Sequence, residues 1–413
     1  QGAAARKGIF FVDAKDGFVK DGNKNRLREQ DIKRIVDTWN ARHDVPHYAK
    51  FVPISGENSI EANDYNLNIP RYIQPADTEI CQDIDAHLHG GIPKHDVEQL
   101  SAYWTVCPSL RSALFDETAE RITLRTDKAT IANVIAADHS FIEQKNHFSR
   151  SIKAWCDNMR PLFRGLTTNI KPKALIEEWA QSLLDIMKED KSLVDAYDAY
   201  QQLLTYWHDT LQDDCYIISH DGWKPTLLRG TKKTATYEDM VCDLLPVGIV
   251  LNEYFADELE EIATITAERD EVAAELQAMI DVVLDESAED DEDEIKALTD
   301  EVKKTKEYKA KDKVRKAIDK RLKEKKAALT EAVAAKYAAF TEAEVIDLVV
   351  EKKWIATITT MIQSEMQQVT QRLTANIAAI VERYEQTLSV IDAEVSDLEA
   401  KVNSHLAKMG FSL

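Results

Sequence analysis

Three histidines lie close together in the sequence, at His87, His89 and His95, and the aspartates Asp85 and Asp96 stand among them. Imidazole nitrogens and carboxylate oxygens are common ligands of a zinc site. His87 and His89 are two positions apart, however, so on a helix they point to different sides. The spacing therefore disfavours a metal site, and we expect none in this chain.

The acidic run from Asp285 to Glu294 is a second group that could bind a cation, because eight of its ten residues are Asp or Glu. It lacks the alternating ligand spacing and the central Gly of a calcium-binding loop, so a solvated turn is the favoured interpretation. The sequence also lacks a Gly-x-Gly-x-x-Gly loop, a Walker loop, a Gly-x-Ser-x-Gly elbow and a His-Glu-x-x-His motif. We therefore predict no catalytic residue in this chain.

A polar string runs from Asn63 to Tyr72 and reads Asn-Asp-Tyr-Asn-Leu-Asn-Ile-Pro-Arg-Tyr. Asn and Asp favour turns because their side chains bond to nearby backbone groups, and Pro70 keeps Ile69 extended. The string is either a connecting loop that closes a domain or a polar surface that presents Asn, Tyr and Arg to a ligand or to DNA. Composition alone favours the loop.

The residues around this string predict a small α/β segment followed by helices. The apolar run from Ile9 to Val12, which Asp13 follows, predicts a buried strand whose neighbours in the sheet lie mostly upstream. A polar, basic loop with a Gly turn follows at residues 20–28, and then an amphipathic helix at residues 29–42. Residues 78–245 predict helices with short breaks, packed around one aromatic-rich core that contains Trp155, Trp179, Trp207 and Trp223.

The strongest periodic signal lies near the C-terminal end. From Ile355 to Met409 an apolar residue falls at every third or fourth position, and no Pro or Gly intervenes before Gly410. This spacing predicts one helix of about 80 Å, which needs a partner to bury its apolar stripe. Residues 255–283 have the same spacing, so we predict a long antiparallel coiled-coil hairpin with a charged tip near residues 285–326.

Length and charge narrow the classes of protein. A chain of 413 residues predicts two or three domains, and the net charge of −21 argues against a protein whose whole surface coats nucleic acid. The five scattered cysteines indicate reduced thiols, and no signal peptide or membrane-spanning run is present. These features predict a cytoplasmic protein. Because Gln1 stands almost directly before the first strand, we expect a fragment of a longer protein.

Several strings in the sequence resemble segments of the modification (M) subunits of type I restriction-modification systems. Residues 6–14, residues 20–28 and the string at residues 63–72 are similar to the end of their methyltransferase domain. Asp-Ala-His-Leu-His-Gly-Gly-Ile-Pro at residues 85–93, residues 206–223, Lys-Lys-Trp at 352–354 and Met-Gly-Phe at 409–411 resemble the extended C-terminal region of one branch of that family.

The resemblance implies an S-adenosylmethionine-dependent enzyme that methylates the N6 amino group of adenine in DNA and flips the base out of the duplex. The Asn-Pro-Pro-aromatic motif of the family is missing from this sequence, so the chain alone is expected to be inactive and to bind no cofactor. The implied partners are a specificity subunit, a restriction subunit, a second modification subunit and DNA. The alternative is a free-standing coiled-coil scaffold or dimerisation protein, which the reading frame upstream of Gln1 would distinguish.

The predicted architecture is mainly α, with a short α/β remnant. Its parts are the edge of a methyltransferase domain at residues 1–76, a helical middle domain at 77–243 and the helical arms at 244–413. The DNA-contact candidates are Lys24, Arg26, Asn66, Asn68, Arg71 and Tyr72. The candidates for docking the specificity subunit are Ile362, Val369, Leu373, Ile380, Leu388, Ile391 and Leu398.

Overall fold

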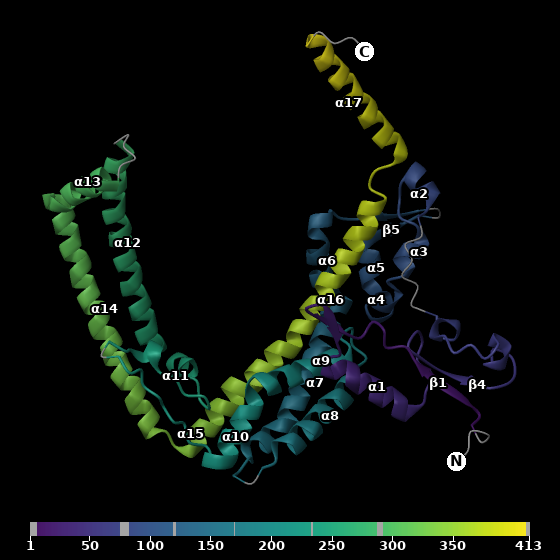
Figure 1. Ribbon diagram of the computed structural model, residues 1–413, viewed down its shortest axis with the longest axis horizontal. Helices are drawn as coiled ribbons and strands as arrows, with labels where there is room; N and C mark the ends of the chain where they lie inside the picture. The colour runs from purple at the N-terminus through teal and green to yellow at the C-terminus, as the bar shows by residue number, and fades with distance from the viewer. Residues whose placement is uncertain are drawn as a thin grey trace. The chain divides into compact units, whose positions relative to one another are not determined.

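The computed structural model describes residues 6–74, 82–118, 121–168, 170–232, 234–286 and 292–409. The described backbone is mainly helical, with short strands toward the N-terminal end, as the sequence predicted (Figure 1). It forms two compact units. One contains the described residues up to Met159, residues Lys173–Asp209 and the residues from Ile358 onward, and the other contains Arg160–Pro172 and Thr210–Thr357.

The first unit begins with three antiparallel strand pairs and a series of helices. Strand β1 (Gly8–Val12) pairs with β4 (Ala49–Pro53), so its neighbour lies downstream of it in the sequence. The other pairs are β2 (Val19–Asp21) with β3 (Lys24–Arg26), and β5 (Phe115–Glu117) with β6 (Ile122–Leu124). The helices that lie wholly or mostly in this unit are α1 (Glu29–Ala41), α2 (Ile84–His89), α3 (Lys94–Glu98), α4 (Ser101–Val106), α5 (Pro108–Leu114), α6 (Ile131–Ala137), α7 (His139–Arg164), α8 (Pro172–Asp190), α9 (Ala196–Tyr206), α16 (Ala356–Arg383) and α17 (Leu388–Lys408).

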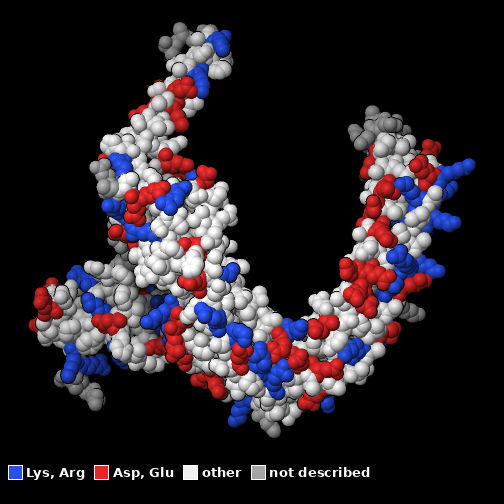
Figure 2. Space-filling model, turned by 180° about the vertical axis from the view of Figure 1, so that it is seen from behind, with Lys and Arg blue, Asp and Glu red and all other residues white. Residues whose placement is uncertain are grey.

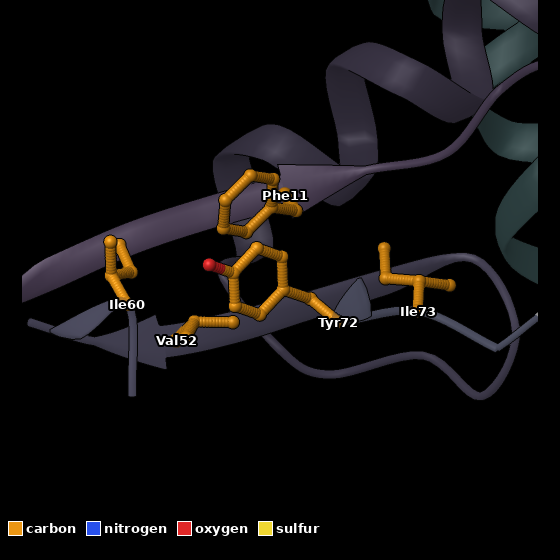
Figure 3. Close-up of a cluster of buried hydrophobic side chains, with 5 residues drawn as sticks. All are labelled: Phe11, Val52, Ile60, Tyr72 and Ile73. Atoms are coloured by element: carbon orange, nitrogen blue, oxygen red, sulfur yellow. The ribbon is translucent and has the colours of Figure 1, made fainter. Parts of the chain in front are cut away.

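The polar string at residues 63–72 folds back on itself into two short 3₁₀ turns, η2 (Glu61–Asn63) and η3 (Ile69–Arg71). Asn66 accepts a hydrogen bond from the backbone N–H of Asn68 at 3.0 Å. At its end, Tyr72 and Ile73 pack with Phe11, Val52 and Ile60 in a small core under β1 and β4 (Figure 3). The rings of Phe11 and Tyr72 stack with centroids 4.7 Å apart, so the string closes this layer.

The second unit contains a helical hairpin (Figure 1). Helices α12 (Ala256–Glu286) and α14 (Lys306–Ala339) run side by side, with α13 (Glu292–Lys304) at one end. The ion pairs Lys311–Glu275, Arg321–Glu268 and Lys325–Glu261 fix an antiparallel register. The unit also contains α10 (Gln212–Asp221), α11 (Val247–Tyr254), α15 (Glu342–Asp347) and the π-helical segment η7 (Leu348–Ile355), while the π-helical turn η5 (Trp207–Leu211) joins α9 to α10 along the chain.

The hairpin differs from the predicted one in its second arm. The sequence assigned that arm to residues 355–409 and placed residues 303–326 at a charged tip, whereas the structure pairs α12 with α14. Leu322, Leu329 and Val333 are buried in α14. The many lysines in this helix made its apolar spacing hard to recognise in the sequence. The long stripe from Ile355 also divides, because α16 ends at Arg383 and α17 begins at Leu388. The coiled-coil packing itself stays a prediction.

Helix α16 belongs to the first unit, where Glu365 is 4% exposed and accepts a hydrogen bond from Gln202 of α9. Burial raises the pKa of this carboxyl, and the Gln202 amide opposes the rise. A carboxyl whose folded pKa lies above its unfolded value weakens folding at neutral pH, and the penalty is relieved as the pH falls through the folded pKa.

We therefore expect Glu365→Gln to stabilise the chain at pH 7 by about 1 kcal/mol, because the amide keeps the acceptor oxygen and removes the buried charge. Urea denaturation at pH 7 and at pH 4.5 would measure the gain, which should shrink at the lower pH. Glu382→Gln, at an exposed position of the same helix, is the control. An equal gain at both pH values would contradict a raised pKa for Glu365.

Candidate nucleic-acid and docking surfaces

The six DNA-contact candidates divide into exposed residues and one core residue. Lys24 and Arg26 stand on the exposed strand β3, where Arg26 lies 3.4 Å from the carboxylate of Asp21. Asn66, Asn68 and Arg71 are exposed in the string at residues 63–72. Tyr72 is 5% exposed and its hydroxyl donates to the carbonyl of Asn66, so its side chain closes the core and is not presented to a ligand.

Helix α1 turns its polar side toward the helices of its own unit. Its Gln30 backbone N–H donates to Gln201 at 3.1 Å and its Gln30 side chain donates to Asp198 at 2.8 Å. Asp37 accepts from Lys188 at 3.0 Å and from the Tyr197 hydroxyl at 3.1 Å. Burial works against a charged Asp37, but the ammonium groups of Lys33 and Lys188 outweigh it and hold its pKa below the usual range.

The apolar side of α1 is exposed. Ile32, Val36 and Trp39 are 45%, 46% and 48% exposed, and Phe51 of β4 is 45% exposed. Phe10 lies between them, because it is opposite Phe51 in the strand pair and its ring is 6.5 Å from that of Trp39. We call these five residues the open apolar face. The sequence identified the stripe on this helix, but periodicity does not show which side faces the core.

The seven docking candidates also fall into two groups. Ile362, Val369, Leu373 and Ile380 of α16 are at most 6% exposed, and hydrogen bonds between Thr359 and Cys156 and from Gln202 to Glu365 connect α16 to α7 and α9. Leu388, Ile391 and Leu398 of α17 are 49%, 38% and 58% exposed. The four α16 residues are therefore core residues of this chain, and the candidate docking surface narrows to α17.

Helix α17 contains no buried residue and touches α2 near its base, while the rest of it projects away from its unit (Figure 1). Its apolar residues are spaced alternately three and four apart at Leu388, Ile391, Val395, Leu398 and Val402, and all of them are exposed. Such spacing makes the narrow seam of a helix that packs along another helix. We call these five residues the α17 seam.

Residues at the break between α16 and α17 contact other parts of their unit and so fix the base of α17. Arg383 lies 3.3 Å from the buried carboxylate of Asp96, and Lys128 donates to Glu385 at 2.6 Å. The ring of Tyr384 packs against that of His87 at 5.0 Å. These contacts link the break to α2, α3 and the turn before α6, so the direction of α17 depends on its own unit.

The three histidines considered for a metal site have separate neighbours. His89 bonds to Asp85 at 2.8 Å, and His95 lies 3.3 Å from Asp96. His87 bonds to Gln82 at 2.7 Å. Within the described residues, no group of three or more His, Cys, Asp or Glu side chains has the arrangement to hold a metal ion, and no helix there has the length and apolar character needed to span a membrane.

A cavity of about 330 Å³ beside β1 offers a test of whether the described residues fit S-adenosylmethionine. Arg28 donates to both carboxylate oxygens of Asp31 at 2.9 Å. The guanidinium of Arg34 lies over the rings of Tyr48 and Tyr197, at 4.7 and 5.7 Å. Both guanidinium groups are thus engaged and they cover the tyrosine rings, whereas an adenine ring needs an apolar wall. The cavity does not fit the cofactor.

Comparison with known proteins finds similarity in the N-terminal segment. Residues 1–80 match the family model described as N-6 DNA Methylase. The type I restriction enzyme MpnII methylase subunit of Mycoplasma pneumoniae is 32% identical over 65 residues, which are 16% of this chain and 11% of that protein. Two methylase subunits of Methanocaldococcus jannaschii type I restriction enzymes, MjaVIII and MjaVII, are 33% and 36% identical over 84 residues, or 19% of this chain and 14% of each relative.

No solved structure matches the chain, and the matched segments are a small part of each curated relative. The segment that matches contains β1, α1, β4 and the string at residues 63–72, which are the features that carried the resemblance in the sequence. Residues 1–80 are therefore similar to the N-6 DNA methylase family model, and part of this segment is similar to methylase subunits of type I restriction enzymes.

Proposed function

We propose that this chain is the C-terminal part of the modification subunit of a type I restriction-modification complex. The complete subunit would transfer a methyl group from S-adenosylmethionine to adenine N6 in DNA, and this part would dock the specificity subunit and help to hold DNA. The family match at residues 1–80 supports the assignment to such a subunit. The observation that carries the docking role is the exposed α17 seam.

The open apolar face supports the placement next to a catalytic domain. Exposed apolar patches of this kind mark interaction sites in soluble proteins, and this one is formed by β1, β4 and α1 of the segment that matches the methylase family. Because the polar side of α1 is already bonded to its own unit, the face remains free for the rest of a methyltransferase domain. The catalytic groups and the cofactor site belong to that domain in this proposal.

The α17 seam fits a helix of another subunit. Most of the stability of a helix in a protein comes from packing its apolar face, and burying the seam against a partner helix would supply that packing. The specificity subunit is the partner that the family resemblance implies. A second copy of this chain is the competing occupant, and it corresponds to the alternative of a coiled-coil dimerisation protein.

We expect the double substitution Ile391→Asp and Leu398→Asp to abolish co-purification of the full chain with the specificity subunit of the same system. Two carboxylates in the seam would have to be buried without partners. Both side chains are exposed in the chain itself, so circular dichroism should show unchanged helix content. Pull-down from co-expressing cells measures the association.

Ala393→Asp with Ala400→Asp is the matched control, because it adds the same charge to the opposite side of α17. The control should co-purify like the unchanged chain. If the seam variant also co-purifies, the docking proposal is wrong. If the unchanged chain is instead a dimer that the seam variant converts to a monomer, with no specificity subunit bound, the dimerisation alternative replaces it.

A further inference from the structure

A row of five lysines lies along the outer side of α14. Lys309, Lys313, Lys316, Lys320 and Lys323 follow one another at intervals of four and three residues, and all are exposed. Such intervals keep side chains on one face of a helix. At 1.5 Å per residue the row is about 21 Å long. We call these five residues the lysine row.

The lysine row faces away from the packed side of the hairpin. The buried residues Leu322, Leu329 and Val333 lie on the side of α14 that meets α12, and the helical rotation of 100° per residue places the row about opposite to them. Lysines on the inner side, such as Lys311 and Lys325, are paired with glutamates of α12. Figure 2 shows Lys and Arg gathered along one edge of this hairpin.

Most of the charge in the lysine row is available. Among the described residues, Lys309, Lys313 and Lys323 form no ion pair within 4 Å. Lys316 pairs with Asp312 and Lys320 with Glu324, but these two lysine side chains are 69% and 79% exposed. Ion pairs at such positions contribute roughly 0 to 1 kcal/mol to stability. Both lysines can therefore leave their carboxylate partners and bind another anion.

We propose that the lysine row binds the phosphate backbone of DNA without regard to sequence. Lysine is a point charge on a flexible stem and contacts phosphates without fixed geometry. Leu322 is buried, and the 52% exposed Val314 lies at least about 100° around the helix from each lysine of the row. The face of the row therefore lacks the large apolar anchor that a docking site for an acidic protein would need. The inference rests on the proposed function, because the methylase complex is what would bring DNA to the hairpin.

The test replaces all five lysines of the row by Gln in the full chain. Binding to a short random-sequence duplex is measured by fluorescence anisotropy between about 50 and 200 mM salt. Each phosphate contact contributes about 0.9 to the slope of log K against log salt, so the slope should fall by about 4 and affinity should drop at least about tenfold at the lower salt. Because the row is exposed, thermal unfolding should be unchanged.

A matched control removes the same charge elsewhere, by replacing five other exposed lysines with Gln: Lys153, Lys173, Lys352, Lys401 and Lys408. Equal loss of affinity in both variants would reduce the effect to net charge and overturn the inference. Failure of the unchanged chain to bind the duplex would also overturn it, as would displacement of the duplex by a small excess of polyglutamate. The α17 pull-down does not involve the row, so a negative result here with intact co-purification leaves the proposed function standing.

Discussion

Replacing Lys353 by Met is expected to destabilise the second unit by about 3 to 5 kcal/mol, because it leaves a buried carboxylate without its counter-charge. Lys353 and Asp214 are 6% and 2% exposed. The lysine ammonium donates to Asp214 at 2.8 Å and to the carbonyl oxygens of Asp243 and Leu244 at 2.6 and 3.0 Å. Methionine fills the space of the side-chain stem but satisfies none of these three acceptors.

The position of Lys353 explains why the single substitution Lys353→Met is expected to have so large an effect on stability. Lys353 lies in η7, Asp214 in α10, and the two carbonyls in the chain just before α11, so one ammonium group connects three segments. The neighbouring Trp354 indole N–H donates to the second oxygen of Asp214 at 2.7 Å. Burial raises the pKa of Asp214, and Lys353 and Trp354 oppose that rise. Removing Lys353 therefore removes the interaction that does most to lower the pKa of Asp214.

Urea denaturation followed by amide exchange of α10 and η7 measures this loss within the second unit. Lys352→Met is the control, because Lys352 is 51% exposed and its pair with Glu253 lies at the surface, where a loss of less than about 1 kcal/mol is expected. The double variant with Asp214→Asn should lose less than the sum of the single losses, since the buried charge is then gone. Strict additivity would contradict a direct charge pair.

The sequence contains no local signal for this cluster. Lys-Lys-Trp at residues 352–354 looks like an ordinary helical segment, and Asp214 stands 139 positions earlier. Only the π-helical backbone of η7 and the fold of its own unit bring the two together. The same limit applies to the predicted aromatic core. Trp179 packs against Trp207 in the first unit, while Trp223 packs against Trp354 in the second, because tertiary contacts and not spacing decide which tryptophans meet.

Periodicity predicted the existence of helices better than the direction in which they face. The stripe on α1 was identified correctly, yet its polar side is the bonded one and its apolar side forms the open apolar face. A single segment cannot reveal this, since an apolar stripe shows only that a partner is needed. The turns in the string at residues 63–72 were better predicted, because the side chains of Asn63 and Asn66 bond locally and local chemistry is readable from sequence. The prediction that Pro70 keeps Ile69 extended was wrong, because Ile69 begins the 3₁₀ turn η3.

The division of the predicted 55-residue helix into α16 and α17 has a similar cause. No Pro or Gly stands between Arg383 and Leu388, so nothing in the sequence ends the helix there. The break lies where Arg383, Tyr384 and Glu385 contact Asp96, His87 and Lys128. Contacts between residues far apart in the chain therefore override a continuous periodic pattern, and they separate a buried stripe from an exposed one.

This separation gives two leucines of the same periodic stripe opposite roles. Leu373 of α16 is fully buried, whereas Leu398 of α17 is 58% exposed. Leu373→Ala should lower the free energy of unfolding by about 2 to 5 kcal/mol, from lost apolar burial and the cavity left behind. Leu398→Ala should change it by less than about 0.5 kcal/mol, because its side chain is already in water.

Urea denaturation of the two variants measures the difference, and co-purification with the specificity subunit supplies the complementary readout. Leu398→Ala should weaken that association while leaving stability unchanged, since the seam loses apolar area only in the complex. Ala393→Gly is unsuitable as a control because it weakens the helix itself, so Ala393→Ser serves instead. Similar stability losses at Leu373 and Leu398 would show that α17 is packed in the free chain, and the seam would then be unavailable to any partner.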